Sequence, residues 1–475
     1  MGQFEQSEQF EQFELIVRGG MVVLSNEVRP ADIGIRNGKI AAVVDDLTSR
    51  SQAAQVYDAS GLYIMPGMID AHVHLNEPAL GHWEGFETGS AALAAGGCTT
   101  YIDMPLNGVP PTVRLEALEK KLALADGVSA VDFALWGGLV PGNVERLAEL
   151  AEAGVIGFKA FMSCPGGEGE DIFAEVDELT LYEGMKEIAR LGKVLALHAE
   201  SEPIVSKLAK EAVAAGKRGA MDFVNSRPVL AELEAVNRAL FFAELTGCAL
   251  HFVHISSSEA VELISSAKAR GMNVTVETCP HYLTLTLEDV VRLGAVAKCA
   301  PPLRSSEEQE RLWAAVRAGK IDIIASDHSP CPTSMKDGDM FEAWGGISGA
   351  QSSLELMLDE GHVRRGIPLP ELSKWLSLNP AKRFGLYPRK GEIAIGMEAD
   401  LAIIDMGESY TLASSDLLQR HKHSPYIGRS LGCRVKATMV RGNVVYEQKP
   451  DGVKLTARTG RWIRYDEGNG GKLYG

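Results

Sequence analysis

Residues 154–162 read GVIGFKAFM, an apolar and strand-like stretch that carries a single lysine, Lys159. Seven further apolar runs lie in the central part of the chain, at 65–75, 98–105, 131–139, 193–200, 249–256, 273–280 and 321–329. Longer segments with helical spacing of apolar residues separate several of them, for example 113–126, 143–153 and 178–192. Eight buried strands that alternate with helices predict an α/β fold of the (β/α)8 TIM-barrel type.

A doubly wound open sheet would show a similar alternation of strands and helices. It would be supported by a glycine-rich nucleotide-binding motif after one of the strands, and the sequence has none. The barrel is therefore the favoured interpretation of the central region.

The two ends of the chain have a different pattern, with short strand-like runs and turn signals. Residues 32–43, DIGIRNGKIAAV, carry an Asn-Gly turn between apolar runs, and residues 391–405 and 435–447 are also strand-like. We expect these ends to combine into one small β-sandwich domain. The expected organisation is a flexible tail at 1–12, sandwich strands at 13–65, a metal-dependent hydrolase barrel at 66–385, further sandwich strands at 386–455 and a C-terminal extension at 456–475.

The composition is that of a globular chain, with 45% hydrophobic and 23% charged residues in 475. No apolar run is long enough to cross a bilayer, and the first residues lack the features of a signal peptide. The seven cysteines are scattered without a CxxC pair, which favours reduced thiols and a cytoplasmic location. A net charge of -16 argues against nucleic acid as a partner. We expect a small-molecule substrate and no membrane or nucleic-acid partner.

Six residues with metal-ligand chemistry lie in or at the downstream ends of five predicted strands: His72, His74, Lys159, His198, His254 and Asp327. In a barrel these strand ends form the catalytic face. His72 and His74 are two residues apart, so both imidazoles lie on the same side of a strand. Asp70 shares that side and could orient a ligand. Imidazole and carboxylate groups suit zinc and related divalent ions.

Each of these residues also has an alternative interpretation. The four histidines could be hydrogen-bonded core residues, and Asp327 could cap a helix or pair with His328. His251 does not share strand spacing with His254, so we interpret it as structural. Lys159 could point to the surface or pair with an acid. The metal interpretation explains why all six occur together at strand ends.

Lys159 is the most informative of the six because a buried ammonium group without a partner tends to lose its proton. A neutral amine can react with CO2 to give a carbamate. This anion has two oxygens and could bridge two cations. Lys159 therefore turns the prediction of a single metal into that of a two-metal centre.

The chain resembles the cyclic-amide branch of the amidohydrolase superfamily, which comprises dihydroorotases, hydantoinases (dihydropyrimidinases) and allantoinases. The resemblance runs over nearly the whole chain, including NPAKRFG at 379–385 and GMEADLAIID at 396–405. It implies that two divalent metal ions, zinc foremost but with cobalt, manganese or iron suitable, are held by His72, His74, His198, His254, Asp327 and N6-carboxylysine at Lys159. It also implies a homotetrameric assembly. We expect Asp327, as a metal ligand beside the attacking hydroxide, to be the catalytic proton carrier.

Residues 66–113 are most similar to allantoinases, and two positions distinguish the chain from the other groups. Dihydroorotases carry a carboxylate-binding Arg two residues after the HxH motif, where this chain has Asn76. Hydantoinases carry an oxyanion-supporting Tyr five residues after the carbamylated Lys, where this chain has Cys164. The candidate substrate contacts are Asn76, Cys164 and Gly346. Of these, Gly346 lies in the loop WGGISGAQ at 344–351.

The expected function is hydrolysis of the cyclic amide of allantoin to allantoate. A hydantoinase or dihydropyrimidinase activity on related cyclic amides is the first alternative. A hydrolytic deaminase is more distant, because many deaminases of the superfamily use one metal and no bridging Lys. A non-catalytic scaffold is a further alternative, and the complete ligand set argues against it.

Overall fold

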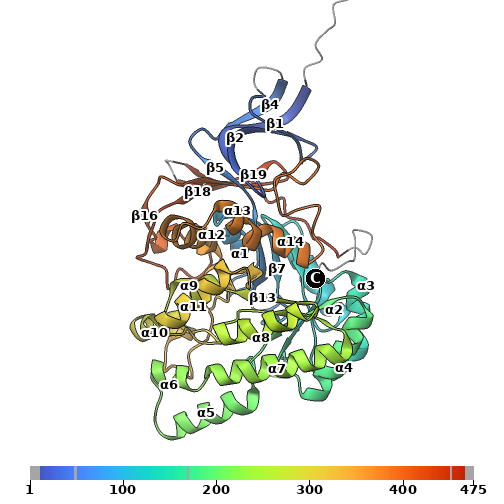
Figure 1. Cartoon of the computed structure of the whole chain (residues 1–475), viewed down its shortest axis with the longest axis vertical. Helices are drawn as coiled ribbons and strands as arrows, with labels where there is room; N and C mark the ends of the chain where they lie inside the picture. Colours follow the sequence, from blue (N-terminus) through green and yellow to red (C-terminus); the bar gives the residue numbers. More distant parts are fainter. Residues whose placement is uncertain (1–10, 48–50, 168–170, 450–451, 466–475) are drawn as a thin grey trace, which may run out of the picture.

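The computed structural model describes residues 11–47, 51–167, 171–449 and 452–465. It has a strand-rich part built from both ends of the chain, above a larger part in which helices surround strands (Figure 1). Residues 1–10 of the expected tail lie outside the described residues, whereas Glu11 and Gln12 already belong to the first strand.

The strand-rich part is a nine-stranded sheet within the described residues, in the order β20-β19-β18-β15-β5-β1-β2-β3, with β4 also paired to β1. The two ends of the chain meet where β5 pairs antiparallel with β15. The sheet branches at β1, which pairs with β2, β4 and β5. The strands are β1 Glu11–Val23, β2 Val28–Arg36, β3 Lys39–Val44, β4 Ser51–Asp58, β5 Tyr63–Pro66, β15 Leu401–Asp405, β18 Arg434–Val440, β19 Asn443–Lys449 and β20 Gly452–Leu455.

The sheet has its own apolar core, because alternate side chains of its strands point to one side. Val17, Ile33, Ile64, Leu401 and Ile403 are all fully buried in this cluster. A short separate hairpin joins β16 Tyr410–Thr411 to β17 Ser430–Leu431. The expected sandwich-forming segments from both ends of the chain thus share one sheet and one core.

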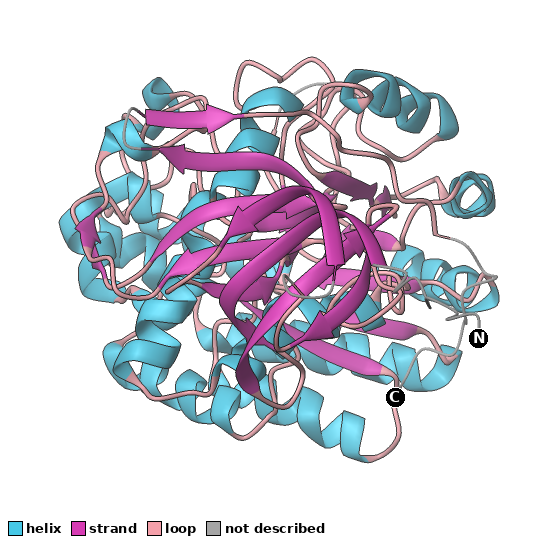
Figure 2. Ribbon diagram, turned by 90° about the horizontal axis from the view of Figure 1, so that it is seen from above, coloured by secondary structure: helices cyan, strands magenta, loops and turns pink. Residues whose placement is uncertain are grey.

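The central strands are parallel and form two sheets, β6-β7-β8 and β9 to β14. They are β6 Met68–Val73, β7 Cys98–Asp103, β8 Asp132–Leu135, β9 Gly137–Gly138, β10 Phe158–Phe161, β11 Val194–His198, β12 Ala249–Phe252, β13 Val274–Thr278 and β14 Ile323–Ile324. Seen from above, strands gather at the centre and helices lie around them (Figure 2).

Backbone hydrogen bonds join the two central sheets at both seams. The amide of Ile156 donates to the carbonyl of Leu135 at 2.9 Å, and β9 continues the line of β8 after Trp136. At the other seam the amide of His74 donates to the carbonyl of His328 at 2.8 Å. These bonds close the ring of strands, as the predicted barrel requires.

The helices around the barrel follow the strands along the chain. They are α1 Phe86–Ala95, α2 Leu115–Ala125, α3 Leu147–Ala153, α4 Glu178–Arg190, α5 Glu202–Ala214, α6 Ala220–Asn225, α7 Val229–Thr246, α8 Ser258–Ala269, α9 Pro280–Thr284, α10 Leu287–Leu293, α11 Ser306–Arg317, α12 Ser353–Met357, α13 Leu369–Ser373 and α14 Asn379–Arg383. None of these described helices combines the length and apolar character needed to cross a bilayer.

Helix α4 illustrates how the sequence determines where a helix begins and which face it buries. Asp177 caps its first turn by accepting from the amide of Thr180 at 2.7 Å. Leu181, Met185 and Ile188 follow at spacings of four and three residues, so they lie on one face, and all three are buried. The helix therefore packs this stripe against the barrel and exposes its charged residues.

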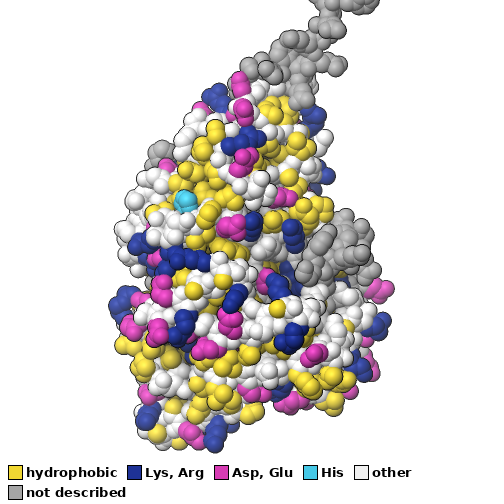
Figure 3. All heavy atoms as spheres, viewed as in Figure 1, with side chains coloured by type: hydrophobic (Ala, Val, Ile, Leu, Met, Phe, Trp, Pro, Cys, Tyr) yellow, Lys and Arg dark blue, Asp and Glu magenta, His cyan; other side chains and the backbone are white. Residues whose placement is uncertain are grey.

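Residues 456–465 of the C-terminal extension return to the barrel. The amide of Phe133 in β8 donates to the carbonyl of Arg461 at 3.0 Å, and the amide of Ile463 donates back to Phe133 at 2.7 Å. Residues 466–475 lie outside the described residues. Figure 3 shows acidic and basic side chains scattered together over one face.

Candidate metal centre and active-site pocket

The six candidate ligands come from strands on both sides of the barrel. His72 lies in β6 and His74 directly follows it, Lys159 lies in β10, and His198 is the last residue of β11. His254 follows β12 by two residues and Asp327 follows β14 by three. Because all these strands are parallel, their carboxyl ends meet at one face of the barrel.

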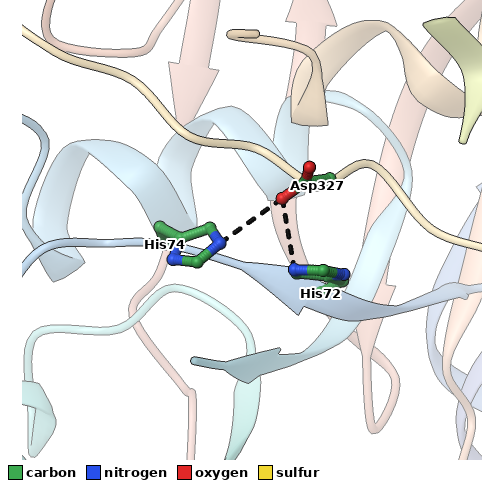
Figure 4. Close-up of side chains that lie close together, drawn as sticks. All are labelled: His72, His74 and Asp327. Atoms are coloured by element: carbon green, nitrogen blue, oxygen red, sulfur yellow. Dashed lines mark ion pairs between the residues drawn. The ribbon is translucent and has the colours of Figure 1, made fainter. Parts of the chain in front are cut away.

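His72, His74 and Asp327 form the first group within this site. The Nε2 atoms of His72 and His74 lie 3.2 and 3.3 Å from Oδ1 of Asp327. Figure 4 shows both imidazoles pointing toward this carboxylate. The three side chains can offer their ligand atoms to one metal ion. Burial acts to raise the pKa of Asp327, but the neighbouring histidines hold it well below its usual range.

His198 and His254 form the second group. The Nδ1 atom of His198 lies 3.0 Å from Nε2 of His254, and the two ring centres are 4.7 Å apart. The rings of His254 and His72 are 5.5 Å apart, so the two groups are neighbours. Burial lowers the pKa values of His198 and His254, which favours the neutral imidazole that a metal requires.

Lys159 is fully buried, and its Nζ atom has no hydrogen-bond partner among the described residues. It lies 4.7 Å from the ring centre of Phe161. Burial lowers the pKa of Lys159 to about 7, so a large share of the amine is neutral near neutral pH. Lys159 interacts electrostatically with Asp327 of the first group and with His198 and His254 of the second.

These residues fit a two-cation centre by three observations. The donors are imidazole and carboxylate groups in two adjacent groups. The buried Lys159 amine lacks a partner that would stabilise its charged form. The backbone at His254 and Asp327 has φ values of 40° and 46°, a left-handed conformation that costs energy and is concentrated at functional sites.

Two further carboxylates, Glu277 and Glu200, support the histidines. Glu277 in β13 lies 2.8 Å from Nδ1 of His72 and 3.1 Å from Nε2 of His251. Glu200 lies 2.9 Å from Nε2 of His198 and also pairs with Arg227. Burial acts to raise the pKa of both acids, but their partners lower it to about 2. The signal that could have identified Glu277 and Glu200 is a charged side chain inside or directly after an apolar strand, the same signal that identified Lys159.

Asp70 accepts hydrogen bonds from backbone amides and not from an imidazole. Its Oδ1 atom accepts from the amides of His72 at 3.3 Å and Ser326 at 3.0 Å. It thereby ties β6 to the segment that carries Asp327. Burial raises the pKa of Asp70 to about 6.

A pocket of about 470 Å³ opens beside the candidate ligands. His72, His74, His198, His254 and Asp327 all contribute to its wall. The wall also includes aromatic and charged side chains that no sequence motif marked: Phe161, Phe223, Arg227, Lys298, Phe341 and Trp344. The pocket thus combines an apolar wall with polar groups that can orient a bound substrate.

The three candidate substrate contacts differ in position. Cys164 and Gly346 line the pocket, whereas Asn76 is not among its lining residues. The Asn76 side chain is buried and donates from Nδ2 to the carbonyl of Pro330 at 3.1 Å. The backbone of Gly346 is already engaged, because its amide donates to Lys298 at 2.8 Å and its carbonyl accepts from Lys336 at 2.6 Å.

Known proteins resemble this chain over most of its length. The amidohydrolase family model matches residues 63–445. An allantoinase of Deinococcus radiodurans is 52% identical over 91% of this chain and 95% of its own length. An allantoinase of Rubrobacter xylanophilus is 51% identical over 95% of this chain and 98% of its own length.

Among solved structures, the L-hydantoinase (dihydropyrimidinase) from Arthrobacter aurescens superposes with a TM-score of 0.91 and 38% identity, covering 95% of this chain and 100% of that chain. A dihydropyrimidinase from Brevibacillus agri superposes with a TM-score of 0.86 and 28% identity, covering 95% of this chain and 98% of that chain. These matches confirm the predicted barrel with an added β-sandwich. The chain therefore belongs to the amidohydrolase family, as a hydrolase of the group that acts on cyclic amides.

Proposed function

We propose that the protein is an allantoinase, which hydrolyses the cyclic amide bond of allantoin to give allantoate. The observation that carries the proposal is the arrangement of four histidines and Asp327 in the wall of one pocket at the barrel end, with the buried Lys159 behind the pocket-lining Phe161. Two relatives named allantoinase, 52% and 51% identical over more than nine-tenths of the chain, support this substrate.

We further propose that two divalent cations, zinc foremost and otherwise cobalt, manganese or iron, are held by His72, His74, His198, His254, Asp327 and Lys159. The neutral Lys159 amine would add CO2, forming an N–C bond and releasing one proton, to give N6-carboxylysine. The buried, unpartnered Nζ atom and its lowered pKa support this step. Lys159 lies close enough to Asp327 of the first group and to His198 and His254 of the second for their charges to interact, which supports a bridging role.

The cations, when bound, would lower the pKa of water and polarise the ring carbonyl of the substrate. Asp327 is placed to carry the proton, because it lines the pocket and its lowered pKa keeps it ionised. It would accept one proton from the attacking water and transfer it to the ring nitrogen that leaves. A C–O bond forms, the ring C–N bond breaks, and the product carries a new carboxylate and a new amide N–H.

The pocket walls would position the ring. Cys164 and Gly346 are wall residues, and Gly346 would contact substrate through its Cα because its amide and carbonyl are engaged. Asn76 would act indirectly by holding the carbonyl of Pro330. Arg227 and Lys298 supply polar groups that suit the ureido substituent of allantoin.

The test is hydrolysis of allantoin in water enriched in ¹⁸O, followed by mass spectrometry of the product. We expect one ¹⁸O atom in the new carboxylate of allantoate, and no product from enzyme treated with a chelator. Unchanged allantoin after incubation with the metal-loaded enzyme would contradict the proposal.

A hydantoinase or dihydropyrimidinase is the second candidate, because the solved structure that superposes with a TM-score of 0.91 carries those names. Cys164 stands where the hydantoinases have their oxyanion-supporting Tyr, which favours the allantoinase. A non-catalytic scaffold would not need the full set of six ligand residues.

The family resemblance also supports a homotetramer, which light scattering on the purified protein would test. All seven cysteines are free, which supports a cytoplasmic location.

A further inference from the structure

Glu277 is a fully buried carboxylate that contacts three separate groups near the metal centre. Its Oε1 atom lies 2.8 Å from Nδ1 of His72 and accepts from the backbone amide of His254 at 3.3 Å. Its Oε2 atom lies 3.1 Å from Nε2 of His251, whose Nδ1 lies 2.9 Å from Oγ1 of Thr275. Glu277 therefore connects β6, β12 and β13 at the level of the candidate ligands.

Glu200 is a second fully buried carboxylate, and it contacts the other group of histidines. Its Oε2 atom lies 2.9 Å from Nε2 of His198 and also pairs with the guanidinium of Arg227. Arg227 in turn lines the pocket. Glu200 thus connects a pocket-wall cation to a candidate metal ligand.

An ionised carboxylate has no proton to donate, so the imidazole nitrogen that faces it must carry the hydrogen. Both nitrogens of His72 face a carboxylate, Nδ1 at Glu277 and Nε2 at Asp327, and Asp327 is itself a candidate metal ligand. With a cation held at Asp327, the hydrogen of His72 would stay on Nδ1, beside Glu277, and Nε2 would keep its lone pair. For His198 the facing carboxylate places the hydrogen on Nε2 and leaves Nδ1, which faces His254. The two histidines thus present different ring nitrogens to the centre.

We propose that Glu277 and Glu200 are positioning residues that fix the tautomers of His72 and His198, so that Nε2 of the first and Nδ1 of the second are available to the metals. The inference rests on the proposed two-cation centre. The other nitrogens of the remaining two histidines, Nδ1 of His74 and Nδ1 of His254, have no hydrogen-bond partner among the described residues. Each group thus contains one histidine anchored by a carboxylate and one without such an anchor.

The anchoring carboxylates also restrict the rings in space. Glu277 is held on its far side by His251, and Glu200 is held by Arg227, so neither acid is free to turn away. His198 also stacks on Phe161, with ring centres 4.7 Å apart and planes 15° apart. Carboxylates that hold metal-binding imidazoles typically contribute about 10- to 100-fold to metal affinity.

The test uses Glu277→Gln and Glu200→Gln, which keep the side-chain volume and remove the charge. Asp359→Asn is the matched control, because Asp359 is also a buried carboxylate and accepts from an arginine, Arg364, at 3.0 Å and from the amide of Gly432 at 3.1 Å. Zinc affinity of each metal-free protein is measured by competition with a chromophoric chelator in bicarbonate buffer. The absorption spectrum of the cobalt-loaded protein reports the ligand geometry independently of activity.

We expect each Gln variant to bind one of its two zinc ions about 10- to 100-fold more weakly than the unmodified protein, with an altered cobalt spectrum. Asp359→Asn should match the unmodified protein. If one Gln variant fails to fold, the other tests the same idea at the other histidine.

Zinc affinities equal to those of the unmodified protein in both Gln variants would overturn the proposal. Equal losses in all three variants would also overturn it, because they would indicate a general effect of losing buried charge. Failure of the zinc-loaded, unmodified protein to open allantoin would instead reject the proposed function and leave the carboxylate roles standing.

Discussion

The Nδ1 atom of His198 lies 3.0 Å from the Nε2 atom of His254. Two ring nitrogens this close are held together by a shared proton or by a shared cation. The side chains of His72 and His74 meet in the same way at Asp327, and Lys159 interacts electrostatically with both groups. In the proposed two-cation centre, Lys159 is therefore the residue that would link the two groups.

Substitution Lys159→Ala should reduce allantoin hydrolysis by at least about 1000-fold, because the bridging carbamate and hence the metals would be lost. Metal content measured by elemental analysis should fall in parallel. Added acetate or propionate should restore part of the activity, whereas chloride at the same ionic strength should not. Full activity of this variant without added acid would be incompatible with the carbamate.

Substitution Asp327→Asn should lower kcat by about 100- to 10,000-fold, because the amide cannot carry the proton to the leaving nitrogen. We expect a much smaller change in KM, since the pocket wall keeps its shape. Steady-state kinetics together with metal content separate the proton transfer from loss of a ligand. An unchanged kcat would rule out the proton-carrying role.

Substitution Gly346→Ala should disturb the pocket wall. A Cβ atom there would lie 2.4 Å from the carbonyl oxygen of Ser329, a backbone atom that cannot yield without moving the loop. We expect a several-fold rise in KM and about 1–3 kcal/mol of destabilisation.

The adjacent Gly345→Ala is the matched control for this loop. The nearest neighbour of its Cβ would be the Lys298 side chain, at 3.6 Å, which is an ordinary contact. It should therefore keep a nearly normal KM and thermal stability. Equal effects of the two substitutions would show that the loop does not depend on the approach of Gly346 to Ser329.

The stability of the fold should depend on Glu355, which is buried beside the hydroxyl of Tyr410 at 2.5 Å and the amide of Val435 at 2.7 Å. Burial raises its pKa to about 7. Between about pH 4.5 and 7 the folded chain holds a proton on Glu355 that the unfolded chain releases. Its contribution to stability is therefore fully present at low pH and is lost as the pH rises through 7.

The variant Glu355→Gln removes this dependence. Between pH 5 and 8, urea unfolding should show the unmodified protein losing about 2–3 kcal/mol more than the variant. Parallel pH profiles for the two proteins would mean that the pKa of Glu355 is not raised in the folded state.

Much of the barrel could be predicted from the sequence because its eight parallel strands are buried on both faces and appear as apolar runs. The candidate ligands were detectable for the same reason: Lys159 and His198 are chemically unusual inside such runs. The closure of the ring, through the bond from His74 to His328, involves residues 254 positions apart and has no local sequence signal.

Glu277 was harder to predict than the candidate ligands, because its role depends on a partner far away in the chain. Glu277 contacts His72 across 205 residues, and no spacing rule connects them. For Asn76, closeness in the sequence was misleading. It lies two residues after His74 yet does not line the pocket. Its left-handed backbone, with φ of 66°, accompanies a side chain that bonds to Pro330 instead.

The most direct test of the proposed activity compares kcat/KM of the zinc-loaded enzyme for allantoin, hydantoin, dihydrouracil and dihydroorotate under identical conditions. We predict the highest value for allantoin and the lowest for dihydroorotate, whose carboxylate has no arginine at position 76. A higher kcat/KM for dihydrouracil or hydantoin than for allantoin would contradict the allantoinase assignment.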